Sequence, residues 1–234
     1  MNRLVSVATT VVAVLITGTA CARPGRQPSA GPPPATGAAS TSASTSPATG
    51  SPPAAGGGGG STVNGPPFRV TYGWGVPSTL VTVSNPVPVP PVPYLVEVRT
   101  GDHPEENPGY TRITFAFRGA FPAYRFSYVE RVTADGSGAP VPLPGNAALQ
   151  IVFTPAQAHD DAGASTIGFA SDRTVGLHHL AGYAPAGDYE GYVTYGLGIQ
   201  VAPGSDETPL VRTGQLTRPD PNGPVYVVAV DIRY

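Results

Sequence analysis

Apolar and polar residues alternate over most of the chain after residue 93, and this period of two constrains the fold more than any other feature. Such alternation is typical of strands that bury one face. It is clearest in three segments, whose apolar residues are Ile113, Phe115, Phe117, Tyr124, Phe126, Tyr128, Leu149, Ile151 and Phe153. We find no convincing amphipathic helix, although residues 155–159 are long enough for one helical turn.

Other segments extend the pattern. Residues 189–199 are expected to form a strand whose core face carries Tyr189, Val193, Tyr195, Leu197 and Ile199. Residues 225–234 are apolar on both faces, which predicts a strand covered on both sides. Asp231 falls near the end of that strand, where we expect a change to Asn to be mild. Shorter strands are expected at 96–98 and 175–183. About seven strands separated by Gly-, Pro- and Asn-containing turns indicate an all-β fold, an antiparallel β-sandwich.

The first 21 residues have the layout of a secretory signal peptide. Arg3 precedes a run of 13 uncharged, mostly apolar residues at 4–16, which is shorter than the roughly 20 residues of a membrane-spanning helix. Small residues then lead to Cys21, the only cysteine of the chain. This arrangement resembles the lipobox of bacterial lipoproteins, in which the cysteine receives a diacylglycerol. A lipobox prefers Leu where this chain has Gly18, while the next two positions fit the pattern.

Three outcomes stay open for Cys21. We favour lipidation, which places the protein outside the cytoplasm and anchors it by lipid to the cell membrane. Cleavage after Ala22 would instead discard the thiol and release a secreted protein, and an uncleaved anchor would leave the thiol unmodified.

Two segments separate the signal peptide from the alternating region. Residues 22–66 consist mainly of Pro, Ala, Ser, Thr and Gly and show no hydrophobic pattern, which predicts a disordered linker. Residues 67–93 are expected to form an extended N-terminal segment, with Trp74 packed against the domain that follows. The β-sandwich domain itself is expected at 94–234.

Charge and cysteine content exclude several classes of function. After residue 66 the chain has ten arginines, no lysine and 15 acidic residues, which disfavours nucleic acid as a partner. The mature chain has no cysteine beyond Cys21 for a disulfide or a zinc ribbon. Neither an H-E-x-x-H motif nor another metal-ligand spacing is present. We therefore expect no metal and no cofactor.

The densest group of ionisable residues is the sequence Ala-His-Asp-Asp at 158–161. His159 and Asp160 permit a catalytic interpretation, but neighbouring residues rarely make the oriented pair that base catalysis needs. We favour a turn in which an aspartate bonds backbone amides. The sequence Asp-Gly-Ser-Gly at 135–138 likewise predicts a Gly-rich hairpin turn.

The segment 189–199 also supplies a candidate binding residue. The expected alternation places Tyr189 and Tyr195 on the core side and leaves Tyr192 outward, where its ring could stack on a sugar. Glycines at 191, 196 and 198 predict bulges, close approach of another backbone, or space for a ligand. The candidate ligand-binding residues are Tyr192, Arg125, His159 and Asp160.

Several segments in order along the chain resemble the AMIN-like domain of actinobacterial lipoproteins and secreted proteins. The resemblance is carried by residues 110–119, 124–138, 149–153, 158–160, 188–191 and 195–198. The family is named for its likeness to the AMIN domain, a β-sandwich that targets envelope enzymes such as amidases to peptidoglycan. One departure from the family is the segment 201–221, which is long and loop-like in this sequence.

The resemblance implies a non-catalytic envelope protein whose domain binds or localises to a cell-wall polymer such as peptidoglycan, or to an envelope protein. No amidase domain follows in the sequence, so we expect the module to have nothing catalytic to deliver. One alternative is a secreted structural or assembly protein with only protein partners. A hydrolase that uses His159 and Asp160 is less favoured, because the sequence offers no nucleophile–base constellation such as G-x-S-x-G.

The prediction for Cys21 can be tested by phase partitioning. We expect the unmodified protein to enter the detergent phase and Cys21→Ser to enter the aqueous phase, because only the cysteine can receive the lipid. If both proteins partition into the same phase, whichever phase that is, the lipobox interpretation is wrong.

Overall fold

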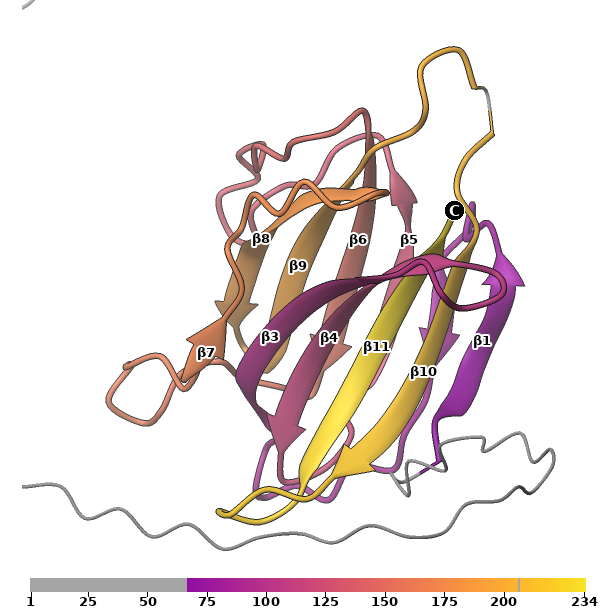
Figure 1. Cartoon of the computed structure of the whole chain (residues 1–234). Coiled ribbons are helices and arrows are strands. Elements are labelled where there is room, and N and C mark those ends of the chain that lie inside the picture. The colour runs from indigo at the N-terminus through magenta and orange to yellow at the C-terminus, as the bar shows by residue number, and fades with distance from the viewer. Residues whose placement is uncertain (1–66, 206) are drawn as a thin grey trace, which may run out of the picture. The chain divides into compact units, whose positions relative to one another are not determined.

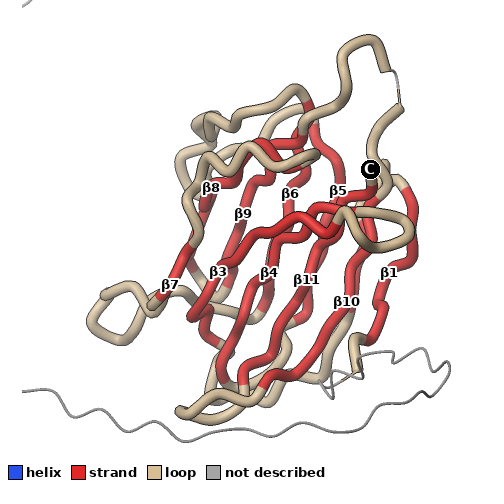
Figure 2. The backbone as a smooth tube through the Cα atoms, in the orientation of Figure 1, coloured by secondary structure: helices blue, strands red, loops and turns tan. Residues whose placement is uncertain are grey.

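The computed structural model describes residues 67–205 and 207–234, and this part of the chain folds into eleven strands without a helix (Figures 1 and 2). The predictions for the signal peptide, Cys21 and the linker lie outside these residues. No helix able to cross a membrane occurs in the described part. The strands are β1 (Arg69–Gly75), β2 (Val81–Val83), β3 (Tyr94–His103), β4 (Tyr110–Arg118), β5 (Ala123–Val129), β6 (Ala147–Thr154), β7 (Phe169–Ala170), β8 (Leu180–Tyr189), β9 (Tyr192–Ile199), β10 (Val211–Arg218) and β11 (Val225–Arg233).

The strands form two sheets that pack face to face. Sheet A has the order β1-β10-β11-β4-β3-β7, and sheet B has the order β2-β5-β6-β9-β8 (Figure 1). All neighbouring strands are antiparallel except β3 and β7, which are parallel. Phe115 of sheet A has its ring centroid 5.0 Å from those of Phe153 and Tyr195 in sheet B. The prediction of an all-β sandwich is confirmed.

The period of two places the core as expected. The inward rows of β4, β5 and β6 are buried in one cluster that joins both sheets. Strand β11 is covered on both sides: Val228 and Val230 face this main cluster, while Val225 and Val227 pack on the opposite side of the sheet. Residues 155–159 form no helical turn; their backbone runs beside β3, where the Leu95 amide donates to the Gln157 carbonyl at 2.8 Å.

The sandwich begins earlier in the chain than the boundary predicted at 94. Strand β1 pairs with β10 in sheet A and β2 pairs with β5 in sheet B, so residues 67–93 supply one edge strand to each sheet. Only part of β1 is buried, since Val70 is half exposed, and an edge strand of this kind carries a weak apolar pattern. Trp74 packs as expected, 6.3 Å from Tyr110 between ring centroids.

The segment 201–221 is not a continuous loop, because it contains β10. The inward residues Thr213 and Gln215 are buried but polar, which removes the apolar alternation from the sequence. Thr213 is held by the hydroxyl of Thr71, with 2.9 Å between the two oxygens. Gln215 accepts a hydrogen bond from Arg69. The inward side chains of β10 are therefore held by hydrogen bonds to β1 at positions where the other strands bury apolar side chains.

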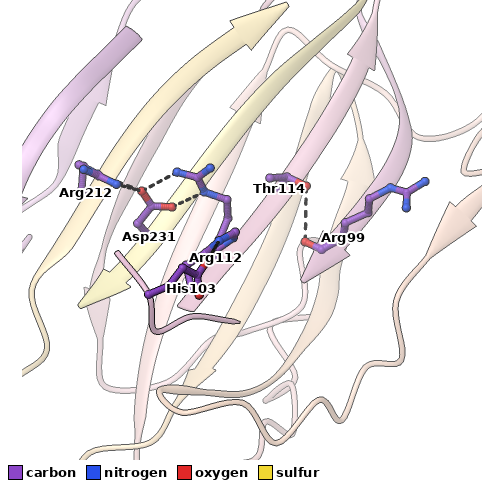
Figure 3. A network of polar contacts seen from close by, with 7 residues as sticks. Arg99, His103, Arg112, Thr114, Arg212 and Asp231 are labelled. Atoms are coloured by element: carbon purple, nitrogen blue, oxygen red, sulfur yellow. Dashed lines mark hydrogen bonds and ion pairs between the residues drawn. The ribbon is translucent and has the colours of Figure 1, made fainter. Parts of the chain in front are cut away.

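The outer face of sheet A carries a buried charge network around Asp231 (Figure 3). Its carboxylate accepts hydrogen bonds from Arg112 at 2.6 and 2.9 Å and from Arg212 at 2.9 and 2.6 Å. The side chain is 0% exposed, and the rings of Phe68 and Trp74 cover the two guanidinium groups. The hydrogen bonds and charge of Asp231 outweigh the effect of burial and raise the pKa of Arg112. The expectation that Asp231 tolerates substitution is therefore wrong.

We predict that Asp231→Asn lowers the free energy of unfolding by about 3 kcal/mol, because it leaves two partly buried guanidinium groups without a counter-ion. The control is Glu130→Gln, which removes an exposed pair with Arg131 and should cost under about 1 kcal/mol. Urea unfolding followed by circular dichroism measures both. Equal unfolding midpoints for the two variants would contradict the assigned role of Asp231.

Candidate functional site

A tight hairpin exposes two tyrosines at one end of sheet B. Glu190 and Gly191 both have positive φ, 51° and 79°, as a two-residue turn between antiparallel strands requires. The turn pairs Tyr189 with Tyr192, and these side chains are 67% and 40% exposed. The expectation that Tyr189 faces the core is wrong, because the turn interrupts the alternation. Tyr195 is buried as expected.

Tyr192 lies in a shallow cavity of about 380 Å³ on the outer face of sheet B, which we call the outer-face site. Arg125 of β5 pairs across the sheet with Val152 of β6, and Val152 pairs with Thr194 of β9. This row of three residues forms the floor of the outer-face site. The guanidinium carbon of Arg125 is 5.8 Å from the centroid of the Tyr192 ring. The remaining lining residues are Asp135, Gly136, Gln150, Tyr189 and Glu190. Two predicted candidates, Arg125 and Tyr192, are therefore brought together.

The loop at 130–146, the covering loop, closes the other part of this outer face. Val132 and Leu143 lie against Gly196, and the carbonyl of Pro144 lies against Gly198, where a side chain would collide with it. The close backbone approach predicted for Gly196 and Gly198 is confirmed, whereas the third glycine, at 191, lies in the hairpin turn.

The covering loop is also tied down by its own turn. The amide of Ala134 donates to the carbonyl of Ala139 at 2.7 Å, which confirms the predicted Gly-rich hairpin turn. The carboxylate of Asp135 accepts a hydrogen bond from Thr194 Oγ1 at 2.6 Å. One rim of the outer-face site is thus held in place by the floor of the site.

The outer-face site combines groups that suit a sugar ligand. Tyrosine has a flat apolar ring and a polar hydroxyl, so it can cover the C–H face of a sugar ring and still bond water or ligand. The amide of Gln150 and the guanidinium of Arg125 offer hydrogen bonds to hydroxyl, acetamido or carboxylate groups. An apolar surface with a few polar groups around it is the usual form of a small-ligand site.

Comparison with known proteins assigns the fold to a family. The family model of the AMIN-like domain matches residues 93–233. The chain belongs to the AMIN-like domain family. Searches of curated proteins and of solved structures gave no match. Membership points to an extracytoplasmic protein of the cell envelope and associates the domain with the cell wall. Strands β1 and β2 of the sandwich precede the matched residues.

The other two predicted site residues lie elsewhere in the AMIN-like domain and do not pair with each other. One carboxylate oxygen of Asp160 accepts from the amides of Ala162 at 2.9 Å and Ala164 at 2.8 Å, so the favoured turn interpretation is confirmed. His159 instead contacts Asp188 of β8, with 2.7 Å between Nδ1 and Oδ2. Sequence reasoning missed Asp188 because it is distant in the chain from His159.

The described residues of the AMIN-like domain contain no group of three or more His, Cys, Asp or Glu placed to hold a metal ion. The expectation that the protein needs no metal and no cofactor stays a prediction. His178 and His179 precede β8, and their ring centroids lie 5.1 Å apart. Their rings lie 4.2 and 6.0 Å from that of Tyr234.

The contact between the covering loop and β9 predicts that a single methyl group added to a glycine of β9 lowers the stability of the domain. Gly198→Ala should lower the free energy of unfolding by about 1–3 kcal/mol, because the new Cβ meets the backbone of Pro144. Gly101→Ala is the control, since no atom lies within 4 Å of its added Cβ. Thermal melts compare the two. A melting temperature of Gly198→Ala equal to that of Gly101→Ala would show that the loop does not rest on this glycine.

Proposed function

We propose that this AMIN-like domain is a non-catalytic binding module that holds the protein on peptidoglycan through the outer-face site. The observation that supports this proposal most is the pair of exposed tyrosines, Tyr189 and Tyr192, which line a cavity together with Arg125. Tyrosine side chains are intermediate in burial, and the hairpin turn holds these two at the surface. The association of the family with the cell wall supports a glycan strand as the ligand.

The polar groups of the site support binding over catalysis. The hydroxyl of Thr194 is buried and donates to Asp135, so its role is to fasten the covering loop. The only aspartate next to His159 in sequence, Asp160, is engaged with backbone amides away from the histidine. These hydrogen bonds of Asp160 support a binding module over a hydrolase that would use His159 together with Asp160.

The proposed location follows from the N-terminal sequence. We propose that Cys21 anchors the protein to the membrane and that residues 22–66 act as a flexible tether. A coil of this length has a root-mean-square reach of roughly 35–40 Å. That reach separates the domain from the membrane surface and brings it to wall polymer.

The test is co-sedimentation of the full chain with purified peptidoglycan sacculi. Tyr192→Ala and Arg125→Gln should each weaken binding about five- to tenfold, because each removes one ligand contact from the site. The matched controls are Phe169→Ala and Arg99→Gln, because Phe169 is another exposed aromatic and has Arg99 4.5 Å above its ring on sheet A. The controls should bind as the unmodified protein does.

Two results would refute the proposal. The first is equal binding by Tyr192→Ala and Phe169→Ala with unchanged thermal melts. The second is a full chain that stays in the supernatant at every sacculus concentration. In the second case, cross-linking to a membrane protein would favour the alternative in which the partner is an envelope protein.

A further inference from the structure

A second cavity, of about 270 Å³, lies beneath the connection between β6 and β8. That connection leaves sheet B, adds β7 to sheet A and returns to sheet B. We call this cavity the edge pocket. Its lining includes His159 and Arg173 from the connection, Asp188 from β8, and Tyr195 from β9. Neither Arg125 nor Tyr192 contributes to it, so it is distinct from the outer-face site.

Tyr195 has a polar group that the fold leaves without a partner. Its side chain is only 4% exposed, yet its hydroxyl makes no hydrogen bond to any described residue. Two other buried tyrosines are paired, Tyr124 with Thr71 and Tyr183 with the carbonyl of Ser171. Burial raises the pKa of Tyr195, so the hydroxyl remains a proton donor. Among the described residues, Nε2 of Gln215 is the only enclosed side-chain atom without a partner, so the Tyr195 hydroxyl is open to solvent at the pocket and free to donate to a ligand.

Arg173 adds a positive charge at the same pocket. Its carbonyl accepts from the Tyr183 amide at 2.9 Å, which fixes its backbone against β8. No acid of the described residues forms an ion pair with its guanidinium, whereas Arg112 and Arg212 share Asp231. A planar guanidinium offers two parallel N–H groups that match the two oxygens of a carboxylate.

His159 is oriented by Asp188 at the wall of the pocket. The two oxygens of Asp188 accept from the Ala158 amide at 3.0 Å and from Nδ1 of His159 at 2.7 Å. An ionised carboxylate only accepts, so Nδ1 carries a proton and Nε2 is the nitrogen left for another partner. Each oxygen of Asp188 therefore has one partner within the fold.

We propose that the edge pocket binds the terminal carboxylate of a small aliphatic ligand, such as the C-terminal residue of a short peptide. Arg173 binds the carboxylate, and the hydroxyl of Tyr195 donates to it. Ile167 and Val193 provide an apolar wall for a methyl-sized side chain. The volume is just below the roughly 300 Å³ at which pockets for drug-sized ligands begin, so the pocket suits one or two residues.

The test is calorimetric titration of the full chain with alanyl-alanine, with its C-terminal amide and with inorganic phosphate. We expect a dissociation constant of about 1 mM for alanyl-alanine, in keeping with its size. The amide should bind about tenfold more weakly, because it has no charge for Arg173. Phosphate should also bind more weakly than the dipeptide, because it leaves the apolar wall uncovered.

Variants of the edge pocket test whether alanyl-alanine binds there. Arg173→Gln should weaken alanyl-alanine binding about tenfold. Tyr195→Phe should weaken it about threefold or more while keeping the ring that packs on Phe115. The controls are Arg131→Gln, an exposed arginine elsewhere, and Tyr128→Phe, whose hydroxyl donates to the Pro209 carbonyl. Neither control should change the affinity.

Any of four results would overturn the proposal: no heat of binding with alanyl-alanine at millimolar concentration, equal affinity for the amide, tighter binding of phosphate, or unchanged affinity in both pocket variants. Tyr192→Ala separates this proposal from the outer-face site. It should weaken sacculus binding and keep the affinity for alanyl-alanine. The edge pocket and the outer-face site can therefore fail independently.

Discussion

The contact between the two sheets through aromatic side chains is the interaction on which the rest of the domain depends. Phe115 and Phe117 of β4 pack within about 5 Å of Phe153 on β6, as measured between ring centroids. The chain has a single cysteine and therefore no disulfide of its own to cross-link the sheets, so burial of these rings is a main source of the stability that holds the sheets together. Both cavities described above are positioned by this core, one on its outer surface and one at its margin.

The outer faces of the two sheets differ in what covers them. On sheet A, rings and guanidinium groups cover Asp231, and the charges there are largely paired within the fold. On sheet B, glycines let the covering loop lie directly on the strands, and the rest of that face stays open around Arg125 and Tyr192. On sheet A the charged groups around Asp231 are paired with other groups of the protein. On sheet B the tyrosine rings and the arginine side chain of the outer-face site remain exposed.

The alternation of apolar residues predicted the core rows of β4, β5, β6 and β11, because a period of two is visible wherever one face of a strand buries apolar side chains. It could not predict β10, whose inward residues are Thr213 and Gln215, nor the exposure of Tyr189, which depends on a turn that resets the alternation. Tyr192 was found from its residue type and its outward position in the alternation, and Arg125 was named as a candidate beside it. Asp188 and Asp231 were missed because their partners come from distant strands, which local patterns do not reveal.

The position of β1 has a mechanical consequence. The described chain enters the sandwich through this strand, which lies at the edge of sheet A and is held by β10 through a pairing with two irregularities in register. Just before it, the ring of Phe68 lies on Gly214 and beneath the guanidinium groups of Arg112 and Arg212. A force applied from the N-terminal side therefore loads β1 and this ring first. The core strands β4 and β11 carry the load only after the edge strand has peeled away.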